Sequence, residues 1–246
     1  MGYQFVLEIQ DMGIRALKKD ITIKANAQRA TLLQRYFKTG KGEYAEGDIF
    51  LGLTVPQCRQ IANKYRDLAI TESKTLLQSK YHEERLIALL ILVDQFSRYD
   101  NKNNKLIFDT YLSLTNFINN WDLVDLTAPK IIGKYLFTNK SDLLFKLAAS
   151  DNLWERRIAV LATFYFIQQN SFIEALQVAK ILVNDKHDLI HKAVGWMLRE
   201  IGKRDLLTEE KFLKKYLKVM PRTMLRYAIE KFPEEKRRQY LMKVHA

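Results

Sequence analysis

Apolar stretches with helical periodicity recur through this sequence, and they constrain the fold more than any other feature. Residues 86–93, Leu-Ile-Ala-Leu-Leu-Ile-Leu-Val, are apolar on nearly every side, which is typical of a helix packed on two faces. Residues 158–167 and 193–201 show a similar pattern. Runs with a period of two residues between turn signals are absent, and glycine (9) and proline (4) are scarce. The sequence therefore predicts an all-α fold with almost no sheet.

A small residue recurs at one position of these helices. When the helices are aligned on it, the series is Ala88, Ala128, Ala159, Gly195 and Ala228. A period of roughly 35 residues with two helices per unit is typical of HEAT-like or armadillo-like repeats. The repeats are degenerate, because only three of the five have a basic residue three positions before the small residue. The alternative is that the spacing of these helices arose by chance. We expect one domain over residues 1–246, with residues 1–22 as an N-terminal extension. Its architecture would be an irregular α-solenoid with a basic concave groove.

Local signals predict where several helices begin. Ser, Thr, Asp and Asn cap helix N-termini, and proline is common in the first turn. Such signals occur at Ser150-Asp151-Asn152, at Thr54 with Pro56, and at Thr208-Glu209-Glu210. Looser connections are expected at residues 38–48, which contain three glycines, and at the polar residues 99–105.

Composition narrows the cellular setting and the class of partner. The single cysteine, Cys58, excludes a disulfide framework and any multi-cysteine metal site, and we expect it to be a small core or helix residue. No signal peptide or membrane span is evident, so we expect a soluble cytoplasmic protein that acts as a monomer. The net charge is +12, and residues 186–246 alone carry 16 Lys and Arg against 8 Asp and Glu. Such a charge favours nucleic acid as the partner, the alternative being a protein that is basic without binding it.

Trp121 and Asp125 are the residues most suggestive of chemistry. They are four positions apart, so on a helix they share a face, and Pro129 should kink or end that helix. The alternatives are a core tryptophan and a capping or ion-paired aspartate. Both residues lie in Asn120-Trp121-Asp122-Leu123-Val124-Asp125.

Two later segments add aromatic and basic side chains. In Trp154-Glu155-Arg156-Arg157, the tryptophan is expected to be a packing anchor, and the arginines form either a solvated face or phosphate contacts. Trp196 lies in an otherwise apolar helix, where packing and function are equally consistent. Lys192 and Arg199 flank it and are further candidates for DNA binding. In a curved repeat stack, Asp125, Arg157 and Trp196 could converge in one groove.

The motifs of other enzyme classes are missing from the sequence. It contains no Gly-x-Ser-x-Gly, Walker, Gly-x-Gly-x-x-Gly or His-Glu-x-x-His motif. His187 and His191 have the i, i+4 spacing of a metal pair, but Asp188 lies off their shared face, so we expect neither a metal nor another cofactor.

The chain resembles the AlkD-type DNA alkylation repair glycosylases, a family of HEAT-like-repeat proteins. The resemblance spans roughly residues 30–235 and is carried by four segments in order, which are Phe50 to Arg59, Trp121 to Pro129, Ser150 to Arg157 and Lys192 to Glu200. It places the family's catalytic aspartate at Asp125, its sugar-facing tryptophans at Trp121 and Trp196, and its DNA-contacting arginine at Arg157, with Arg156 as the less favoured neighbour. The family's second tryptophan beside Trp121 is Asn120 here.

The implied reaction is hydrolysis of the N-glycosidic bond of N3- or N7-alkylated purines, such as 3-methyladenine and 7-methylguanine, in duplex DNA. The enzyme would be a monofunctional alkylpurine DNA glycosylase of base excision repair. Because an alkylated base is cationic and leaves as a neutral molecule, no general acid is required. A carboxylate at Asp125 could stabilise the oxocarbenium-like sugar and hold the attacking water. The family is thought to act without enclosing the base, so bulky adducts should be tolerated.

Two other functions remain open from the sequence. A DNA-binding or scaffold protein of the same repeat fold would use Trp121, Asp125 and Trp196 as core or cap residues. A protein-recognition solenoid is less favoured because its groove need not be so basic. DNA binding that weakens steeply with salt would favour the glycosylase or the DNA-binding protein over the protein-recognition solenoid.

Overall fold

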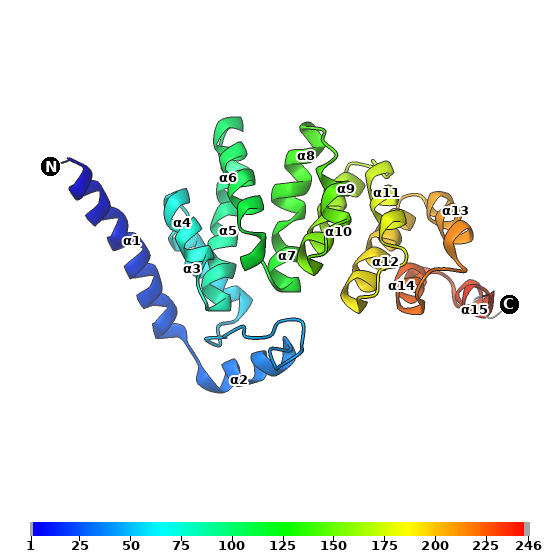
Figure 1. The fold of residues 1–246 in the computed structure, drawn as a ribbon, viewed down its shortest axis with the longest axis horizontal. Coiled ribbons are helices and arrows are strands. Elements are labelled where there is room, and N and C mark those ends of the chain that lie inside the picture. Colours follow the sequence, from blue (N-terminus) through cyan, green and yellow to red (C-terminus); the bar gives the residue numbers. More distant parts are fainter. Residues whose placement is uncertain (1, 244–246) are drawn as a thin grey trace. The chain divides into compact units, whose positions relative to one another are not determined.

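The described part of the chain consists of helices joined by loops in the computed structural model (Figure 1). The structure describes the backbone of residues 2–243 and the side chains of residues 13–242, so part of the predicted extension, residues 1–22, lies outside the described side chains. Within these limits no strand forms, and an isolated bridge pairs Ile49 with Tyr81. The predicted all-α class is confirmed. None of the described helices is both long and apolar enough to span a bilayer.

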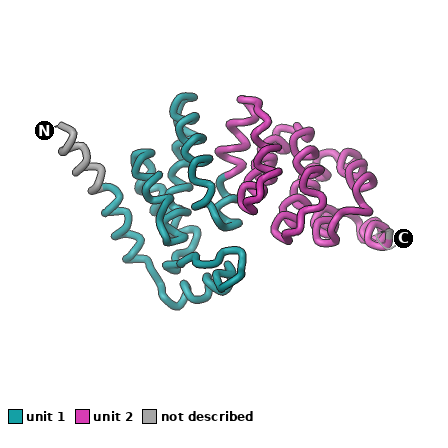
Figure 2. Tube along the Cα trace, in the orientation of Figure 1, with its two compact units in different colours: residues 1–127 teal, residues 128–246 magenta. Residues whose placement is uncertain are grey.

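The helices form two compact units, residues 1–127 and residues 128–246, drawn in teal and magenta in Figure 2. In the first unit, α5 is central and packs against α3, α4, α6 and α7, while α1 packs against α3 and α4. The elements of this unit are α1 (Gly2–Lys24), α2 (Ala27–Tyr36), α3 (Val55–Lys64), α4 (Ile70–Leu77), α5 (His82–Arg98), α6 (Asn101–Ser113), η1 (Thr115–Phe117) and α7 (Trp121–Thr127).

In the second unit, two long helices, α10 and α12, pack against each other and hold the shorter helices around them. Helix α10 also contacts α9 and α11, and α12 also contacts α13 and α14. The elements are η2 (Pro129–Gly133), α8 (Lys134–Thr138), α9 (Leu143–Ala148), α10 (Leu153–Gln168), α11 (Ile173–Ile181), α12 (Asp188–Gly202), α13 (Leu206–Tyr216), α14 (Arg222–Ala228), η3 (Ile229–Lys231) and α15 (Glu234–Lys243).

The recurring small residues lie at the packed centres of these units. All five of them, Ala88, Ala128, Ala159, Gly195 and Ala228, are buried. A Cβ atom added to Gly195 would lie 2.4 Å from the carbonyl oxygen of Met224, so α12 and α14 approach more closely than any larger residue would allow. The helical-repeat fold predicted from their spacing is thereby supported.

Most of the predicted helix starts are observed. Thr54 and Gln57 form a capping box at α3, and the Asn152 side chain accepts a hydrogen bond from the Trp154 N–H at the start of α10. The start predicted at Thr208 is wrong, because Asp205 caps α13 and the helix begins at Leu206. The connection expected at residues 99–105 is also mostly helical, since Asp100 caps α6.

Pro129 has the expected effect on its helix. Helix α7 ends at Thr127, and residues 129–133 continue as a π-helical turn. Proline has no N–H for the α-helical hydrogen-bond ladder, and a π turn accommodates the interruption. The α-helical segment with Trp121 and Asp125 is therefore only two turns long and depends on its surroundings for its position.

Candidate active site

Trp121 and Asp125 lie on the same side of α7 and line a pocket within the first unit. This aromatic pocket has a volume of about 460 Å³, within the range of about 300–1,000 Å³ that is common for small-molecule sites. Helices α2, α5 and α7 and the segment 50–55 surround it. Its wall is largely apolar and consists of Arg29, Leu33, Tyr36, Phe37, Phe50, Leu53, Thr54, Val55, His82, Glu83, Leu86, Trp121, Asp122, Asp125 and Leu126.

A series of stacked rings forms one side of the aromatic pocket. Phe37 stacks on Trp121 at a centroid distance of 5.1 Å and on Phe50 at 4.9 Å. Phe50 in turn stacks on the imidazole of His82 at 4.3 Å. Tyr36, whose side chain is exposed, meets the edge of Trp121 at 6.1 Å. Trp121 is therefore part of an aromatic cluster that keeps its ring in place.

Glu83 shapes another part of the pocket wall by binding the backbone of residues 51–53. Its carboxylate accepts hydrogen bonds from the N–H groups of Leu51, Gly52 and Leu53, at 2.8, 2.7 and 3.1 Å. Gly52 has a φ of +87°, and a Cβ atom there would lie 2.1 Å from the carbonyl oxygen of Asn26. The segment therefore needs glycine at this position, both for its backbone conformation and for its contact with the start of α2.

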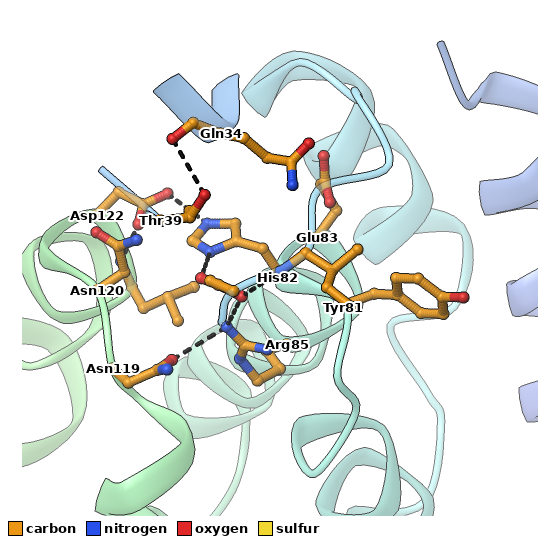
Figure 3. Close-up of polar contacts among 12 residues, drawn as sticks. Gln34, Thr39, Tyr81, His82, Glu83, Arg85, Asn119, Asn120 and Asp122 are labelled. Atoms are coloured by element: carbon orange, nitrogen blue, oxygen red, sulfur yellow. Dashed lines mark hydrogen bonds and ion pairs between the residues drawn. The ribbon is translucent and has the colours of Figure 1, made fainter. Parts of the chain in front are cut away.

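A buried histidine connects this wall to α7 (Figure 3). His82 Nδ1 lies 2.9 Å from Asp48 Oδ2, and His82 Nε2 lies 2.9 Å from Asp122 Oδ2. An ionised carboxylate only accepts hydrogen bonds, so both ring nitrogens must donate and the ring is an imidazolium. Arg85 completes the group, because its Nη2 donates to Asp48 Oδ1 at 2.6 Å and to Asn119 Oδ1 at 3.0 Å.

The charges of this buried group balance. Burial by itself would lower the pKa of His82, but the carboxylates of Asp122 and Asp48 outweigh it and raise the pKa to about 9. Burial would likewise raise the pKa of Asp48, yet His82 and Arg85 hold that pKa below its ordinary value. Two cations and two anions share one buried site, which is how charges are tolerated in a protein interior. We refer to His82, Asp48, Asp122 and Arg85 as the histidine clamp.

Both ends of α7 are fixed by hydrogen bonds. At its start, the buried Asn120 side chain accepts from the Trp121 N–H at 2.8 Å, and Asp122 is held by His82. At its end, the hydroxyl of Thr127 lies 3.0 Å from that of the buried Tyr111. Asn120 therefore holds the first N–H of the helix from inside the protein. Asp125 itself is half-buried on the pocket wall.

The other predicted site residues lie in the second unit. Trp196 is half-buried, donates from Nε1 to Glu200 at 3.3 Å and lies 6.0 Å from the ring of Phe164. Arg157 is buried, and its guanidinium donates to the carbonyl oxygen of Leu189 at 2.6 Å. These contacts give both side chains a packing role, and their contact with a substrate stays a prediction.

The remaining basic candidates all have acidic neighbours. Arg156 pairs with Asp185 at 2.8 Å, Lys192 pairs with Asp188 at 2.6 Å, and Arg199 pairs with Glu230. The Lys192 pair is well exposed, whereas the side chains of Arg156 and Arg199 are less than one-fifth exposed. Phosphate contacts of these residues stay predictions, as does the convergence of Asp125, Arg157 and Trp196 in one groove.

Cys58, His187 and His191, which were considered as a nucleophile and as metal ligands, have structural contacts instead. Cys58 is buried, and burial raises the pKa of its thiol, which disfavours the reactive thiolate. His187 Nδ1 accepts from the Leu189 N–H, and His191 Nε2 lies 2.5 Å from the carbonyl oxygen of Asp185. Among the described residues, no cluster of three or more His, Cys, Asp or Glu side chains is arranged to hold a metal ion.

Sequence reasoning missed the histidine clamp and the role of Glu83. Four consecutive polar residues, His82 to Arg85, are all less than 6% exposed although such residues usually face solvent. They form the first turn of α5, directly before its apolar run at residues 86–93, and this position was an available signal. Their partners, Asp48 and Asp122, are 34 and 40 residues away from His82, and no local pattern reveals such pairs.

Comparison with known proteins gives a consistent result. The family model described as DNA alkylation repair enzyme matches residues 17–232. A solved structure titled as a predicted DNA alkylation repair enzyme from Enterococcus faecalis superposes with a TM-score of 0.67 and 17% identity, covering 86% of this chain and 98% of that one. The search of curated proteins gave no match. The match to the family model begins at residue 17, so it includes the last residues of the predicted extension.

Proposed function

Because the chain belongs to the family of DNA alkylation repair enzymes, we propose that it is a DNA glycosylase that removes N3- or N7-alkylated purines from duplex DNA. The observation that carries the proposal is the position of Asp125. Asp125 is half-buried and lines the aromatic pocket, on the same helical face as Trp121. A partly desolvated carboxylate beside electron-rich rings is suited to stabilising a developing positive charge.

The reaction needs no acid at the leaving group. As the N-glycosidic bond breaks, its electron pair moves to the alkylated base, which loses its positive charge and departs neutral. The deoxyribose then becomes oxocarbenium-like at C1′, and the Asp125 carboxylate stabilises that charge. A water molecule held by the same carboxylate adds to C1′ and releases one proton to the solvent. The products are the free base and an abasic sugar.

The two tryptophans would act on the sugar. The indole face of Trp121, held in the ring stack by Phe37, offers cation–π attraction to the charge that develops at C1′. We assign the same role to Trp196 of the second unit. Both rings are half-buried, so each can present a surface to a ligand while packing fixes its orientation.

The second unit carries the charge needed to hold the DNA backbone. It contains 23 Lys and Arg against 13 Asp and Glu, a net charge of +10, whereas the first unit has 17 against 15, a net charge of +2. Counterion release would make the second unit the main source of sequence-independent affinity. Lys192, Arg199, Arg156 and Arg157 are the candidate contacts.

The test is release of 7-methylguanine and 3-methyladenine from methylated duplex DNA by the wild type and by Asp125→Asn. The proposal expects a loss of about 10²–10³ in rate, the usual cost of removing one preorganised electrostatic group. Asp109→Asn, on the exposed face of α6 in the same unit, is the matched control and should keep its rate. Absence of release by the wild type, with salt-sensitive DNA binding intact, would instead favour a non-catalytic DNA-binding protein.

A further inference from the structure

Another cavity lies within the second unit, at the end of α12. Its volume is about 250 Å³, less than that of most sites for drug-sized ligands but several times the roughly 30 Å³ that one water takes up. Helices α12, α13 and α14 and the segment 231–233 form its wall. We call it the Glu209 cavity, and its lining residues are Arg199, Gly202, Lys203, Leu206, Glu209, Ala228, Lys231, Phe232 and Pro233.

Glu209 of α13 brings a carboxyl group into this cavity that is almost wholly shielded from solvent. The residue is 1% exposed, and its Oε1 has no hydrogen-bond partner among the described residues. Gly202 makes room for it, because a Cβ atom at that position would overlap Glu209 Oε2. An ionised carboxylate without a partner is costly in such a place, so the protonated form is favoured. Burial accordingly raises the pKa of Glu209 to about 8.

Arg199 of α12 supplies a second polar group without a partner. Its Nη1 pairs with Glu230, but its buried Nε–H meets no acceptor in the part of the chain that the structure describes. Leaving a buried donor without an acceptor is costly. The cavity therefore has two donors, the Nε–H of Arg199 and the protonated carboxyl of Glu209, and it suits a ligand rich in acceptors.

The charge of the cavity wall favours an anion. Besides Arg199, the cations Lys203 and Lys231 line the cavity, and both lysine side chains are partly exposed. The acidic partners of these three cations are not among the lining residues. With Glu209 protonated, the lining groups carry a charge of +3. The rest of the wall is apolar, and a wall of this kind strengthens the attraction between a bound anion and the cations.

We propose that the Glu209 cavity binds a phosphate group that ends within it, either free phosphate or the terminal phosphate of a DNA strand. A phosphate offers several acceptor oxygens to the two donors, and its charge complements the lysines. An internal phosphodiester continues as a chain on both sides, which a cavity of this size and burial does not admit. The site goes beyond the proposed glycosylase function, and loss of phosphate binding would leave the role of Asp125 untouched.

Two substitutions of Glu209 separate hydrogen bonding from packing. Glu209→Gln keeps a donor in nearly the same volume, whereas Glu209→Leu keeps the volume and removes the donor. Neither substitution leaves a new charge in the interior, and thermal unfolding midpoints check that both variants fold. Glu210→Gln is the control, because Glu210 follows on α13, pairs with Lys236 and does not line the cavity.

An NMR titration with sodium phosphate at pH 6 measures binding through the amide signals of Gly202 and Glu209, with sodium chloride keeping the ionic strength constant. We expect the wild type, Glu209→Gln and Glu210→Gln to bind phosphate. Glu209→Leu should bind at least about tenfold more weakly, as the loss of one hydrogen bond to a charged group implies. Absence of binding by the wild type, or unchanged binding by Glu209→Leu, would overturn the proposal.

Sulfate allows a test that needs no apolar variant. Its charge is constant between pH 6 and pH 9, so a change in its affinity reports on the protein. Wild-type affinity should fall about tenfold over this range as Glu209 ionises, and Glu209→Gln should show no such fall. Lysine and arginine keep their charge over this range. The other titratable groups around Glu209 are Arg199, Lys203, Glu210, Lys231, Lys236 and Tyr240. A constant affinity in the wild type would overturn the role of Glu209.

Two duplexes of one sequence distinguish the sources of the phosphate, one with terminal phosphates and one with terminal hydroxyls. Fluorescence anisotropy measures the affinity of the wild type and of Glu209→Leu for each. A preference of the wild type for the phosphorylated duplex that Glu209→Leu lacks would assign the site to DNA ends. Equal affinity for the two duplexes, together with binding of inorganic phosphate, would assign it to free phosphate. A response to neither would overturn the proposal.

Discussion

At the scale of single residues, the histidine clamp determines how the proposed site is held. His82 is 1% exposed and touches two carboxylates and two aromatic rings, and one of those carboxylates, Asp122, is three residues before Asp125. Removing one member of a buried charge group leaves the others uncompensated, which is costly. The groups that face the imidazole are Asp48 and Asp122, with Arg85 bound to Asp48 and Glu83 nearby on the pocket wall.

We predict that the clamp makes the protein less stable at alkaline pH. The folded-state pKa of His82, about 9, exceeds its ordinary value of 6.5, so its stabilisation is complete below pH 6.5 and is lost as the pH rises through 9. The loss should be on the order of 3 kcal/mol in the free energy of unfolding. Urea denaturation of the wild type and of His82→Gln at several pH values measures it.

His82→Gln controls for the other groups that titrate in this pH range. Glu209, for example, has a pKa that burial raises to about 8, so it also changes the stability between its ordinary pKa of 4.5 and pH 8. That contribution is the same in both proteins and cancels in their difference. A difference that stays constant from pH 6 to pH 10 would contradict the imidazolium assignment.

At the scale of helices, close approach at small residues determines the packing. Gly195 of α12 would place an added Cβ 2.4 Å from the carbonyl oxygen of Met224 and 2.6 Å from the Cβ of Tyr227. Neither obstacle is the end of a flexible side chain, so α12 and α14 would have to separate. The apolar residues around this contact belong to the core of the second unit.

We predict that Gly195→Ala destabilises the protein by about 1–3 kcal/mol, the usual cost of overpacking. Alanine is favoured over glycine by about 1 kcal/mol within a helix, so a loss of stability would identify the packing clash as the cause. Gly40→Ala is the control, because an added Cβ there meets only the exposed side chain of Glu43. Chemical denaturation measures both variants, and a gain of stability for Gly195→Ala would refute the close contact.

At the scale of the whole molecule, charge and chemistry are separated along the chain. The second unit holds +10 of the net charge of +12, while the aromatic pocket and Asp125 lie in the nearly neutral first unit. A division of this kind lets one unit supply affinity for phosphates while the other keeps a pocket in which a cation is stabilised.

We predict that affinity for undamaged duplex DNA falls by about 10³ or more between 50 and 200 mM salt, as for a protein with at least about six phosphate contacts. Lys192→Gln should reduce the salt slope by about 1. Lys105→Gln is the matched control in the first unit, since Lys105 forms an i, i+4 surface pair with Asp109 just as Lys192 does with Asp188. Fluorescence anisotropy at several salt concentrations measures the slopes. A slope near zero in the wild type would contradict DNA as the partner.

The sequence by itself determined the helices, their close contacts and the face shared by Trp121 and Asp125. These features follow from spacings of a few residues, and helical geometry converts such spacings directly into faces and caps. Asp205 and Thr208 are both suitable capping residues, and the start of α13 predicted at Thr208 was too late, because Asp205 is the cap.

Only the tertiary structure decided which polar residues are buried and where the pocket lies. His82, Glu83 and Arg85 are polar in sequence, and they can be buried because Asp48, Asp122 and the backbone of residues 51–53 supply their partners. Arg157 likewise is buried on the carbonyl of Leu189, 32 residues later in the chain. These charged groups are stable in the interior because residues far away in the sequence pair with them. A local sequence pattern does not show which distant residues will become those partners.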